Sequence, residues 1–207
     1  EALAQSINVP AVKVLYLAGV NNTVEMAKRF GITTLTDPKR YGLSLVLGGG
    51  EIKMIELLGA YSVLATEGFY HEPTGILKIE DAEGKVLEEY KDKKEEVVDS
   101  QYPRLINKIL SSGELRSPLY SASFGLTQVP GYEVAMKTGT TDNYVDAWTF
   151  GYTPNLVGAV WVGNNNQATT HEGASILAAL PIWHEFMAQA VPKRPYAAFN
   201  SPAPVPT

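Results

Sequence analysis

Residues 137–141, Lys-Thr-Gly-Thr-Thr, place one ammonium group, a glycine and three hydroxyl groups at the end of a strand-like run. Alternation along a strand puts Lys137 and Gly139 on one face and Met136 and Thr138 on the other. A glycine in a strand lets a second backbone approach the strand edge closely. The segment is therefore suited to binding an extended peptide whose carboxylate is held by the hydroxyl and ammonium groups. The alternative interpretation is an exposed strand end with a solvated lysine.

Ser6 and Asn8 form a second pattern, a hydroxyl and an amide separated by one residue. Both residue types often cap helices, and Asn8 stands two residues before Pro10, which suits a first helical turn. Helix capping is therefore the alternative for this pair when it is considered alone. Ser6 and Lys137 are 131 residues apart in the sequence, so only the fold can bring the two patterns together.

Helical patterns dominate the first half of the sequence, and strand patterns follow. Runs at 132–138, 147–152 and 156–162 are rich in aromatic and β-branched residues, and the turn at 153–155 implies an antiparallel hairpin. A charged hairpin is expected at 76–89. We expect an α+β fold in which a helical region precedes an antiparallel sheet with a C-terminal helix packed on it. The expected helices are 1–5, 10–18, 23–30 with Asn22 as its cap, 52–67, 105–112 and 182–190, and 117–130 is expected to be a loop.

Composition excludes several classes of function. The 207 residues include no cysteine and three histidines, so disulfides, thiolate metal sites and cysteine nucleophiles are excluded, and neither a histidine metal site nor a cofactor is expected. The net charge is −5, and the acidity is concentrated in residues 80–99. No basic stripe suggests nucleic acid. No apolar run approaches the roughly 18 residues that a membrane-spanning helix needs.

A Ser-x-Asn element followed far downstream by Lys-Thr-Gly matches the second and third elements of the motif set of penicillin-binding proteins and serine β-lactamases. With further segments in the same order, residues 1–190 resemble the transpeptidase domain of class A (bifunctional) penicillin-binding proteins. The ordered set is specific, although each piece is short. The segments that carry the resemblance are LAQSINVPAV (3–12), LGGGE (47–51), KTGTT (137–141), DAW (146–148), GYTP (151–154), VWVG (160–163) and PIW (181–183).

The resemblance implies a peptidoglycan D,D-transpeptidase at the extracytoplasmic face of the bacterial membrane, which binds D-Ala–D-Ala stem peptides and β-lactam antibiotics. In this family a serine attacks the stem-peptide carbonyl, and an amine then resolves the acyl-enzyme. Ser6 would relay a proton toward the leaving group. Lys137 would hold the Ser6 hydroxyl by a hydrogen bond and keep the cleft positive, which also provides the partner that a desolvated ammonium group needs.

The resemblance also implies the substrate-binding groups. Asn8 would bind the substrate amide, and the hydroxyls of Thr138 and Thr140 would bind its terminal carboxylate beside Gly139. The Thr140 N–H would supply half of the oxyanion hole. Because Thr138 and Thr140 alternate away from Lys137, the strand must twist or bulge for all three side chains to reach one ligand.

The family's nucleophile belongs to a Ser-x-x-Lys motif, and no serine of this sequence has a lysine three residues later. We therefore expect residues 1–190 to be the C-terminal part of an incomplete transpeptidase domain that needs its N-terminal part, with anchor and glycosyltransferase domain further upstream. Residues 191–207 are expected to be a Pro-rich tail or linker. Alone, the chain would be inactive.

Two other functions stay open at this point. A serine β-lactamase relative would need a Glu-x-x-Leu-Asn segment, which the sequence lacks. A non-catalytic peptide-binding module is the third hypothesis. Of the remaining polar and aromatic residues, Asp146 and Trp148 are expected to brace a strand junction, Trp161 and Trp183 to lie in the core, and His184 to pack on the last helix. Met136 and segment 117–128 depart from the family pattern.

Overall fold

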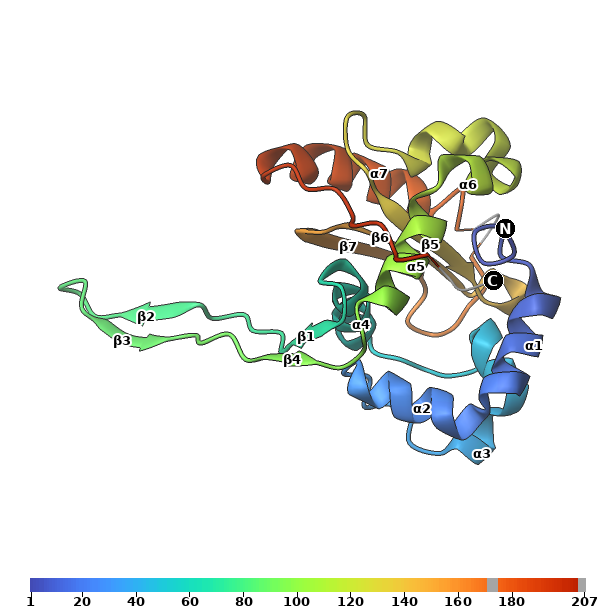
Figure 1. Ribbon diagram of the computed structural model, residues 1–207, viewed down its shortest axis with the longest axis horizontal. Coiled ribbons are helices and arrows are strands. Elements are labelled where there is room, and N and C mark those ends of the chain that lie inside the picture. Colours follow the sequence, from blue (N-terminus) through green and yellow to red (C-terminus); the bar gives the residue numbers. More distant parts are fainter. Residues whose placement is uncertain (171–174, 205–207) are drawn as a thin grey trace.

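The computed structural model describes residues 1–170 and 175–204 and combines helices with antiparallel strands, which confirms the α+β expectation. Figure 1 shows a helical part formed by the N-terminal segment, a sheet flanked by helices, and a narrow ribbon that projects away from both. Within these ranges no helix is both long and apolar enough to cross a membrane.

The main sheet has three antiparallel strands in the order β5-β6-β7, so β5 is an edge strand. The strands are β5 (Ala135–Thr140), β6 (Asp146–Thr153) and β7 (Leu156–Gly163), and they pair in a continuous register. β5 begins later than the sequence predicts because Tyr132 N donates to Val129 O at 3.0 Å and closes a tight turn there.

One face of this sheet is covered by α7 (Ala179–Ala190), the predicted C-terminal helix. Met136 of β5 and Trp183 of α7 are both buried in the cluster between them. The indole Nε1 of Trp183 donates to Gly158 O at 3.1 Å, so its polar group is satisfied inside the core. A Cβ atom at Gly151 would overlap the Trp183 ring, and this close approach explains the glycine.

The opposite face of the sheet packs against α4 (Met54–Ala65) and α5 (Gln101–Ser111). Tyr61 of α4 stacks on Phe150 of β6 with ring centroids 4.7 Å apart. Tyr152 donates its buried hydroxyl to Asn107 Oδ1 of α5 at 2.7 Å. Lys137 lies on this face, because its partner across the β5–β6 ladder is Phe150.

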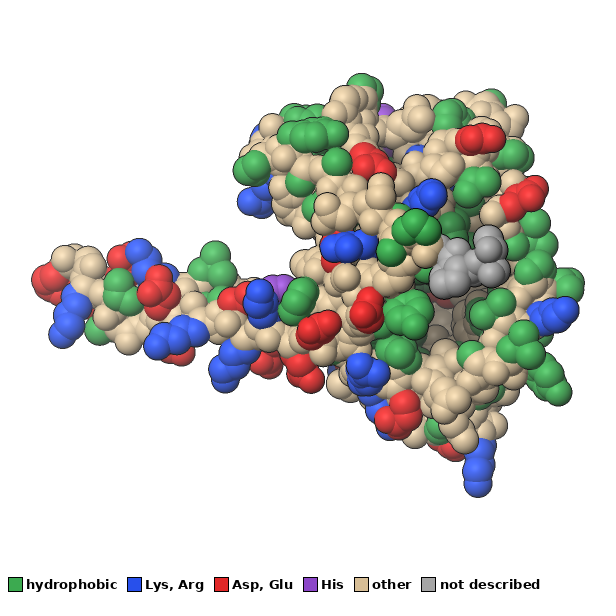
Figure 2. Space-filling model, in the orientation of Figure 1, with side chains coloured by type: hydrophobic (Ala, Val, Ile, Leu, Met, Phe, Trp, Pro, Cys, Tyr) green, Lys and Arg blue, Asp and Glu red, His purple; other side chains and the backbone are tan. Residues whose placement is uncertain are grey.

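The helical part has its own core around the fully buried Val24. Beside it α1 exposes Val9, Val14, Tyr16 and Leu17, each at least 64% exposed, and Figure 2 shows apolar side chains gathered along this side of the molecule. The elements are α1 (Asn8–Ala18), α2 (Val20–Arg29), α3 (Pro38–Tyr41) and the 3-10 helix η1 (Gly42–Leu47).

The ribbon confirms the predicted charged hairpin and continues it with a second pair of strands at its base. β2 and β3 form the outer pair, and every residue in them is exposed. β1 and β4 form the inner pair, in which Phe69 stands opposite Glu96. The strands are β1 (Phe69–His71), β2 (Lys78–Glu80), β3 (Val86–Glu89) and β4 (Lys94–Glu96).

The Pro-rich segment that follows η4 (Val191–Lys193) is extended and lies against the protein up to residue 204. The Phe199 ring meets Tyr152 edge-on, with centroids 5.6 Å apart. Gln101 exchanges two hydrogen bonds with the Ala203 backbone, at 2.8 and 2.7 Å.

Three local predictions were wrong. Asn22 lies inside α2 and donates to Ala18 O, while Gly19 occupies the cap position. Residues 1–5 form a turn and not a helix, since the chain leaves helical geometry at Ser6. The predicted loop at 117–130 is largely helical, since α6 (Gly113–Tyr120) and η2 (Ser121–Thr127) overlap it. The segment has a weak apolar period and an internal proline, and the core contacts of Tyr120 compensate for both.

Candidate active site

The Ser6 and Lys137 side chains meet in the structure, because the Lys137 ammonium group donates a hydrogen bond to the Ser6 hydroxyl. The contact joins the segment before α1 to the middle of the edge strand β5. The two sequence patterns thus come together at one place, as their proposed joint role requires.

Ser6 holds its side chain on an unusual backbone. Its φ angle is +57°, in the left-handed region that non-glycine residues rarely adopt. The residue ends the first turn of the chain and immediately precedes Ile7, the residue before α1. Strain of this kind costs on the order of 1–3 kcal/mol and is concentrated at functional sites. The hydroxyl is presented from an exposed turn and not from a regular element.

Lys137 is held by two oxygen acceptors and by no carboxylate of the described residues. Besides Ser6, its ammonium group donates to Thr138 O at 2.7 Å. Burial lowers the pKa of Lys137 from 10.5 to about 8, since its cross-strand partner Phe150 is 3% exposed and is covered by Tyr61. A lysine with such a pKa can both donate and accept a proton near neutral pH.

The outer edge of β5, next to Lys137, pairs with no other strand of the described residues. Thr141 N donates to Asp146 O at 3.1 Å, so these residues form a hydrogen-bonded pair of the β5–β6 ladder. Because such pairs alternate in an antiparallel ladder, Gly139 and Lys137 also pair with β6, and Thr138 and Thr140 point their backbone groups outward. The Thr140 N–H therefore lies on the open edge, where the oxyanion donor was expected.

The Thr140 side chain is fixed by a residue that sequence reasoning missed. Its hydroxyl donates to Ser175 Oγ at 3.0 Å and accepts from Ser175 N at 3.1 Å. Ser175 is 4% exposed, and its carbonyl accepts from Leu180 N, which ties it to the start of α7. Thr140 itself is exposed, so its hydroxyl is oriented at the surface of the site.

Thr138 does not share the side of Lys137. Its hydroxyl is hydrogen-bonded to Tyr120 Oη at 2.9 Å, and the residue is 8% exposed. The register of β5 against β6 has no bulge that would turn it outward. The alternation predicted from the sequence is therefore confirmed, and the structure does not bring the Thr138 hydroxyl to the place where it would bind a carboxylate. Its carbonyl instead supports Lys137.

Asn8 and Gly139 are both exposed. Asn8 is the first residue of α1, and no side-chain hydrogen bond caps this helix, so the capping alternative is not supported. A Cβ atom at Gly139 would meet only Trp148 Cβ, at an ordinary 3.8 Å. The Asn8 amide therefore has no hydrogen-bond partner in the part of the chain that the structure describes, and the contacts of Gly139 do not themselves require glycine there.

Asp146 braces the turn after β5, as expected. Its Oδ1 accepts from Trp161 Nε1 at 2.8 Å, and its Oδ2 accepts from the Thr141 hydroxyl at 3.0 Å. The ring of Trp148 meets that of Trp161 at a tilt of 44°, with centroids 6.1 Å apart. Trp183 is fully buried as predicted, whereas Trp161 is only partly buried.

No group of three histidine or acidic side chains within residues 1–170 and 175–204 could hold a metal ion. His184 is partly buried on α7, and its Nδ1 is buried without a hydrogen-bond partner. His171 lies outside the described residues. Ser6 and Lys137 lie together beside the edge strand β5.

Comparison with known proteins identifies the family of the chain. The family model "Penicillin binding protein transpeptidase domain" matches residues 1–188. The chain is 33% identical over 98% of its length to penicillin-binding protein 2D of Bacillus subtilis, and 37% identical over 97% of its length to penicillin-binding protein 1A of Aquifex aeolicus. It spans 29% and 27% of these two relatives.

Solved structures resemble the fold closely. The crystal structure of penicillin-binding protein 1A from Haemophilus influenzae superposes with a TM-score of 0.82 at 25% identity, over 97% of this chain and 35% of that one. The structure of PonA1 from Mycobacterium tuberculosis superposes with a TM-score of 0.81 at 27% identity. The match covers 99% of this chain and 59% of that one. That protein is also known in complex with penicillin V, with a TM-score of 0.79 at 26% identity over the same shares of the two chains.

Proposed function

The chain belongs to the penicillin-binding protein transpeptidase family, and from this premise we propose that it supplies the Ser-x-Asn and Lys-Thr-Gly parts of a serine D,D-transpeptidase site that cross-links peptidoglycan stem peptides. One observation carries the proposal: the Lys137 ammonium group binds the Ser6 hydroxyl beside the open edge of β5. The nucleophilic serine would come from a Ser-x-x-Lys segment that these 207 residues do not contain. The site would then lie on the extracytoplasmic face of the membrane, where peptidoglycan is.

The substrate would bind as an extended strand along β5. The stem peptide would pair with the outward backbone groups of the edge, as in strand addition. Its terminal carboxylate would meet the Thr140 hydroxyl, which would exchange its hydrogen bond to Ser175 Oγ for one to the carboxylate. Lys137 lies on the other face of β5 and would contribute only its positive charge. The amide of the substrate would meet Asn8. The open side of Gly139 leaves room for the ligand backbone, since only Trp148 lies near it. β-Lactams would occupy the same edge.

Proton transfer would run through Lys137 and Ser6. When the nucleophile attacks, the scissile carbonyl becomes an oxyanion, and the Thr140 N–H on the open edge would stabilise it. The leaving D-Ala nitrogen needs a proton, and the Ser6 hydroxyl would deliver it and take one from the Lys137 ammonium group. The proton that the attacking serine loses would then restore the charge of Lys137, so that the step balances. The lowered pKa of Lys137, about 8, suits this exchange because the proton is released at little cost near neutral pH.

The apolar face of α1 supports a further part of the proposal. Val9, Val14, Tyr16 and Leu17 are exposed on α1, which begins two residues after Ser6. Exposed apolar patches mark contact surfaces in soluble proteins. The polypeptide that carries the nucleophilic serine would pack there and place its hydroxyl next to Ser6.

The test uses the whole gene product that includes these residues and labels it with a fluorescent penicillin. Lys137→Ala is expected to reduce the acylation rate by roughly a hundredfold or more, as expected when a charged group acting in the transition state is lost. Lys85→Ala, which removes an exposed lysine of the ribbon turn, serves as the control and should label normally. Normal labelling of Lys137→Ala in a folded protein would refute the assigned role.

A second candidate function is peptide binding without acylation. The absence of a Ser-x-x-Lys motif from these 207 residues favours it for the chain by itself. In that case a D-Ala–D-Ala peptide would bind reversibly to the isolated chain and would never form a covalent adduct. Mass spectrometry after incubation with penicillin distinguishes the two candidates.

A further inference from the structure

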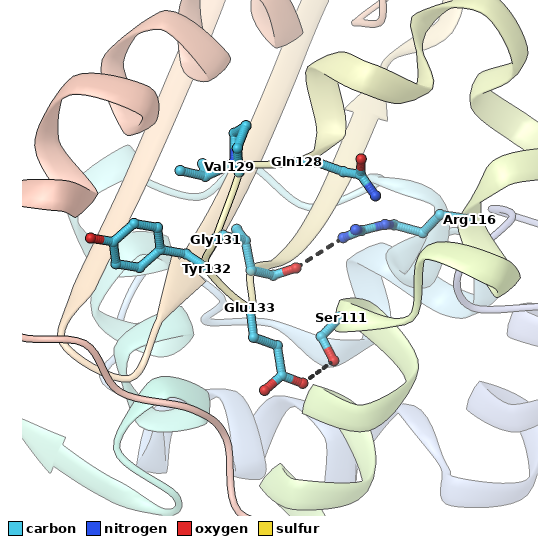
Figure 3. A pocket seen from close by; sticks show the side chains of 9 residues that line it. Ser111, Arg116, Gln128, Val129, Gly131, Tyr132 and Glu133 are labelled. Carbon is cyan, nitrogen blue, oxygen red and sulfur yellow. Dashed lines mark hydrogen bonds between the residues drawn. The ribbon is translucent and has the colours of Figure 1, made fainter.

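A pocket of about 230 Å³ opens between the α5–α6 junction and the segment that leads into β5. Figure 3 shows Arg116 reaching toward this segment, with Gln128 on one side of it and Ser111 and Glu133 on the other. Buried Val129 and Val134 also line the pocket. The pocket therefore combines an apolar wall with a few convergent polar groups, as ligand sites do.

Arg116 is a buried cation without an acidic partner among the described residues. The residue is 3% exposed. Its Nη1 donates to Leu110 O at 2.8 Å and to Val134 O at 3.0 Å, and its Nε is buried without any partner. Burial lowers the pKa of the guanidinium group. The hydrogen bonds to two carbonyls offset only part of the free-energy cost of burying the guanidinium group. An anionic group in the pocket would therefore bind Arg116 strongly.

Glu133 places a negative charge on another wall of the same pocket. Its Oε1 accepts from the Ser111 hydroxyl at 3.0 Å, and its Oε2 accepts from Phe199 N at 3.2 Å. Both donors are neutral, so no cation of the described residues compensates the carboxylate. Arg116 and Glu133 form no salt bridge with each other, although both line the pocket. The site therefore carries one positive and one negative wall.

This charge distribution selects the class of ligand. A simple anion would be repelled by Glu133, and a simple cation would be repelled by Arg116. The volume is below the roughly 300–1,000 Å³ of sites for drug-sized molecules. We infer that the pocket binds a small zwitterion of amino-acid size, with its carboxylate toward Arg116 and its ammonium group toward Glu133. The inference does not depend on the proposed function, because Ser6, Lys137 and Thr140 take no part in the pocket.

Glycine is the probe, and acetate and methylammonium represent its two halves. The ¹⁵N-labelled chain is titrated with each compound, and the backbone amide shifts of residues 128–134 are followed, apart from Pro130, which has no amide hydrogen. Glycine should produce saturable shifts in this segment, with a Kd on the order of millimolar for so few atoms. Acetate and methylammonium should each bind at least about tenfold more weakly, since each meets one repulsive wall.

Glu133→Gln tests the assignment by removing the negative charge while keeping the shape of the side chain. The glutamine oxygen can still accept from Phe199 N, and its Nε2 can donate to the Ser111 hydroxyl, which then acts as acceptor. This variant should bind glycine about tenfold or more weakly than the original chain does, and its affinity for acetate should not fall. Glu114→Gln, an exposed glutamate on the first turn of α6, is the matched control and should leave both affinities unchanged. Absence of saturable glycine shifts, equal binding of acetate and glycine, or unchanged glycine binding in Glu133→Gln would each overturn the inference.

Discussion

Replacing Lys137 with methionine should stabilise the chain at neutral pH. Methionine keeps the length of the side chain and removes a charge that burial disfavours. The pKa of Lys137 falls from 10.5 in the unfolded chain to about 8 in the folded protein. Each pKa unit corresponds to about 1.4 kcal/mol, so the charged form costs the folded state about 3 kcal/mol, and the variant should recover much of this below pH 8.

The pH dependence has a defined sign. Below pH 8 both folded and unfolded states hold the Lys137 proton, and the full cost is present. Between pH 8 and pH 10.5 the unfolded state binds more protons than the folded state, so the free energy of unfolding rises with pH through this window. Lys137→Met should lack this rise.

The assay is urea unfolding at half-unit steps from pH 7 to pH 10.5, and the quantity of interest is the difference in unfolding free energy between the original chain and the variant. This difference removes the contributions of the other titrating groups. It should be largest at pH 7 and should shrink toward pH 10.5. Lys85→Met, on the exposed ribbon turn, is the control and should give a small, constant difference. Parallel curves for the original chain and Lys137→Met would refute the desolvation argument.

Three further outcomes are expected. Gly151→Ala should lower the unfolding free energy by roughly 1–3 kcal/mol, because the new methyl group would overlap the buried Trp183 ring, whereas Gly139→Ala should stay within about 0.5 kcal/mol in the same urea titration. Tyr120→Phe should cost about 1 kcal/mol in that titration by removing the buried bond to Thr138, and equal stability would count against it. The 207-residue chain should show no covalent label after gel analysis with a fluorescent penicillin, and a labelled band would contradict the need for an external nucleophile.

The residues at the centre of the site could be predicted from the sequence, because the types and the order of the residues in their motifs are themselves informative. Ser6 and Lys137 belong to motifs whose chemistry is local to a few residues, and strand alternation placed Thr138 on the far face correctly. The resemblance alone assigned Thr138 to the carboxylate, and the continuous register of β5 does not support that assignment.

Other features left no readable pattern in the sequence. Ser175 lies 35 residues beyond Thr140, and only the packing of α7 brings it to the Thr140 hydroxyl. The helix that carries Arg116 has a weak apolar period and an internal proline, so its existence depends on contacts with the distant core. Asn22 shows the opposite error, since a local capping signal was overridden when α2 began at Val20.

The meeting of Ser6 and Lys137 can be tested directly because the chain contains no cysteine. In the double variant Ser6→Cys with Lys137→Cys, the two introduced thiols are the only ones, and dibromobimane becomes strongly fluorescent when it bridges a thiol pair within its short reach. We expect intramolecular cross-linking in the native chain, and none in urea or in a control that pairs Ser6→Cys with Lys85→Cys on the ribbon. No more cross-linking than in the control would show that the two segments do not meet, and the account of the site would fail.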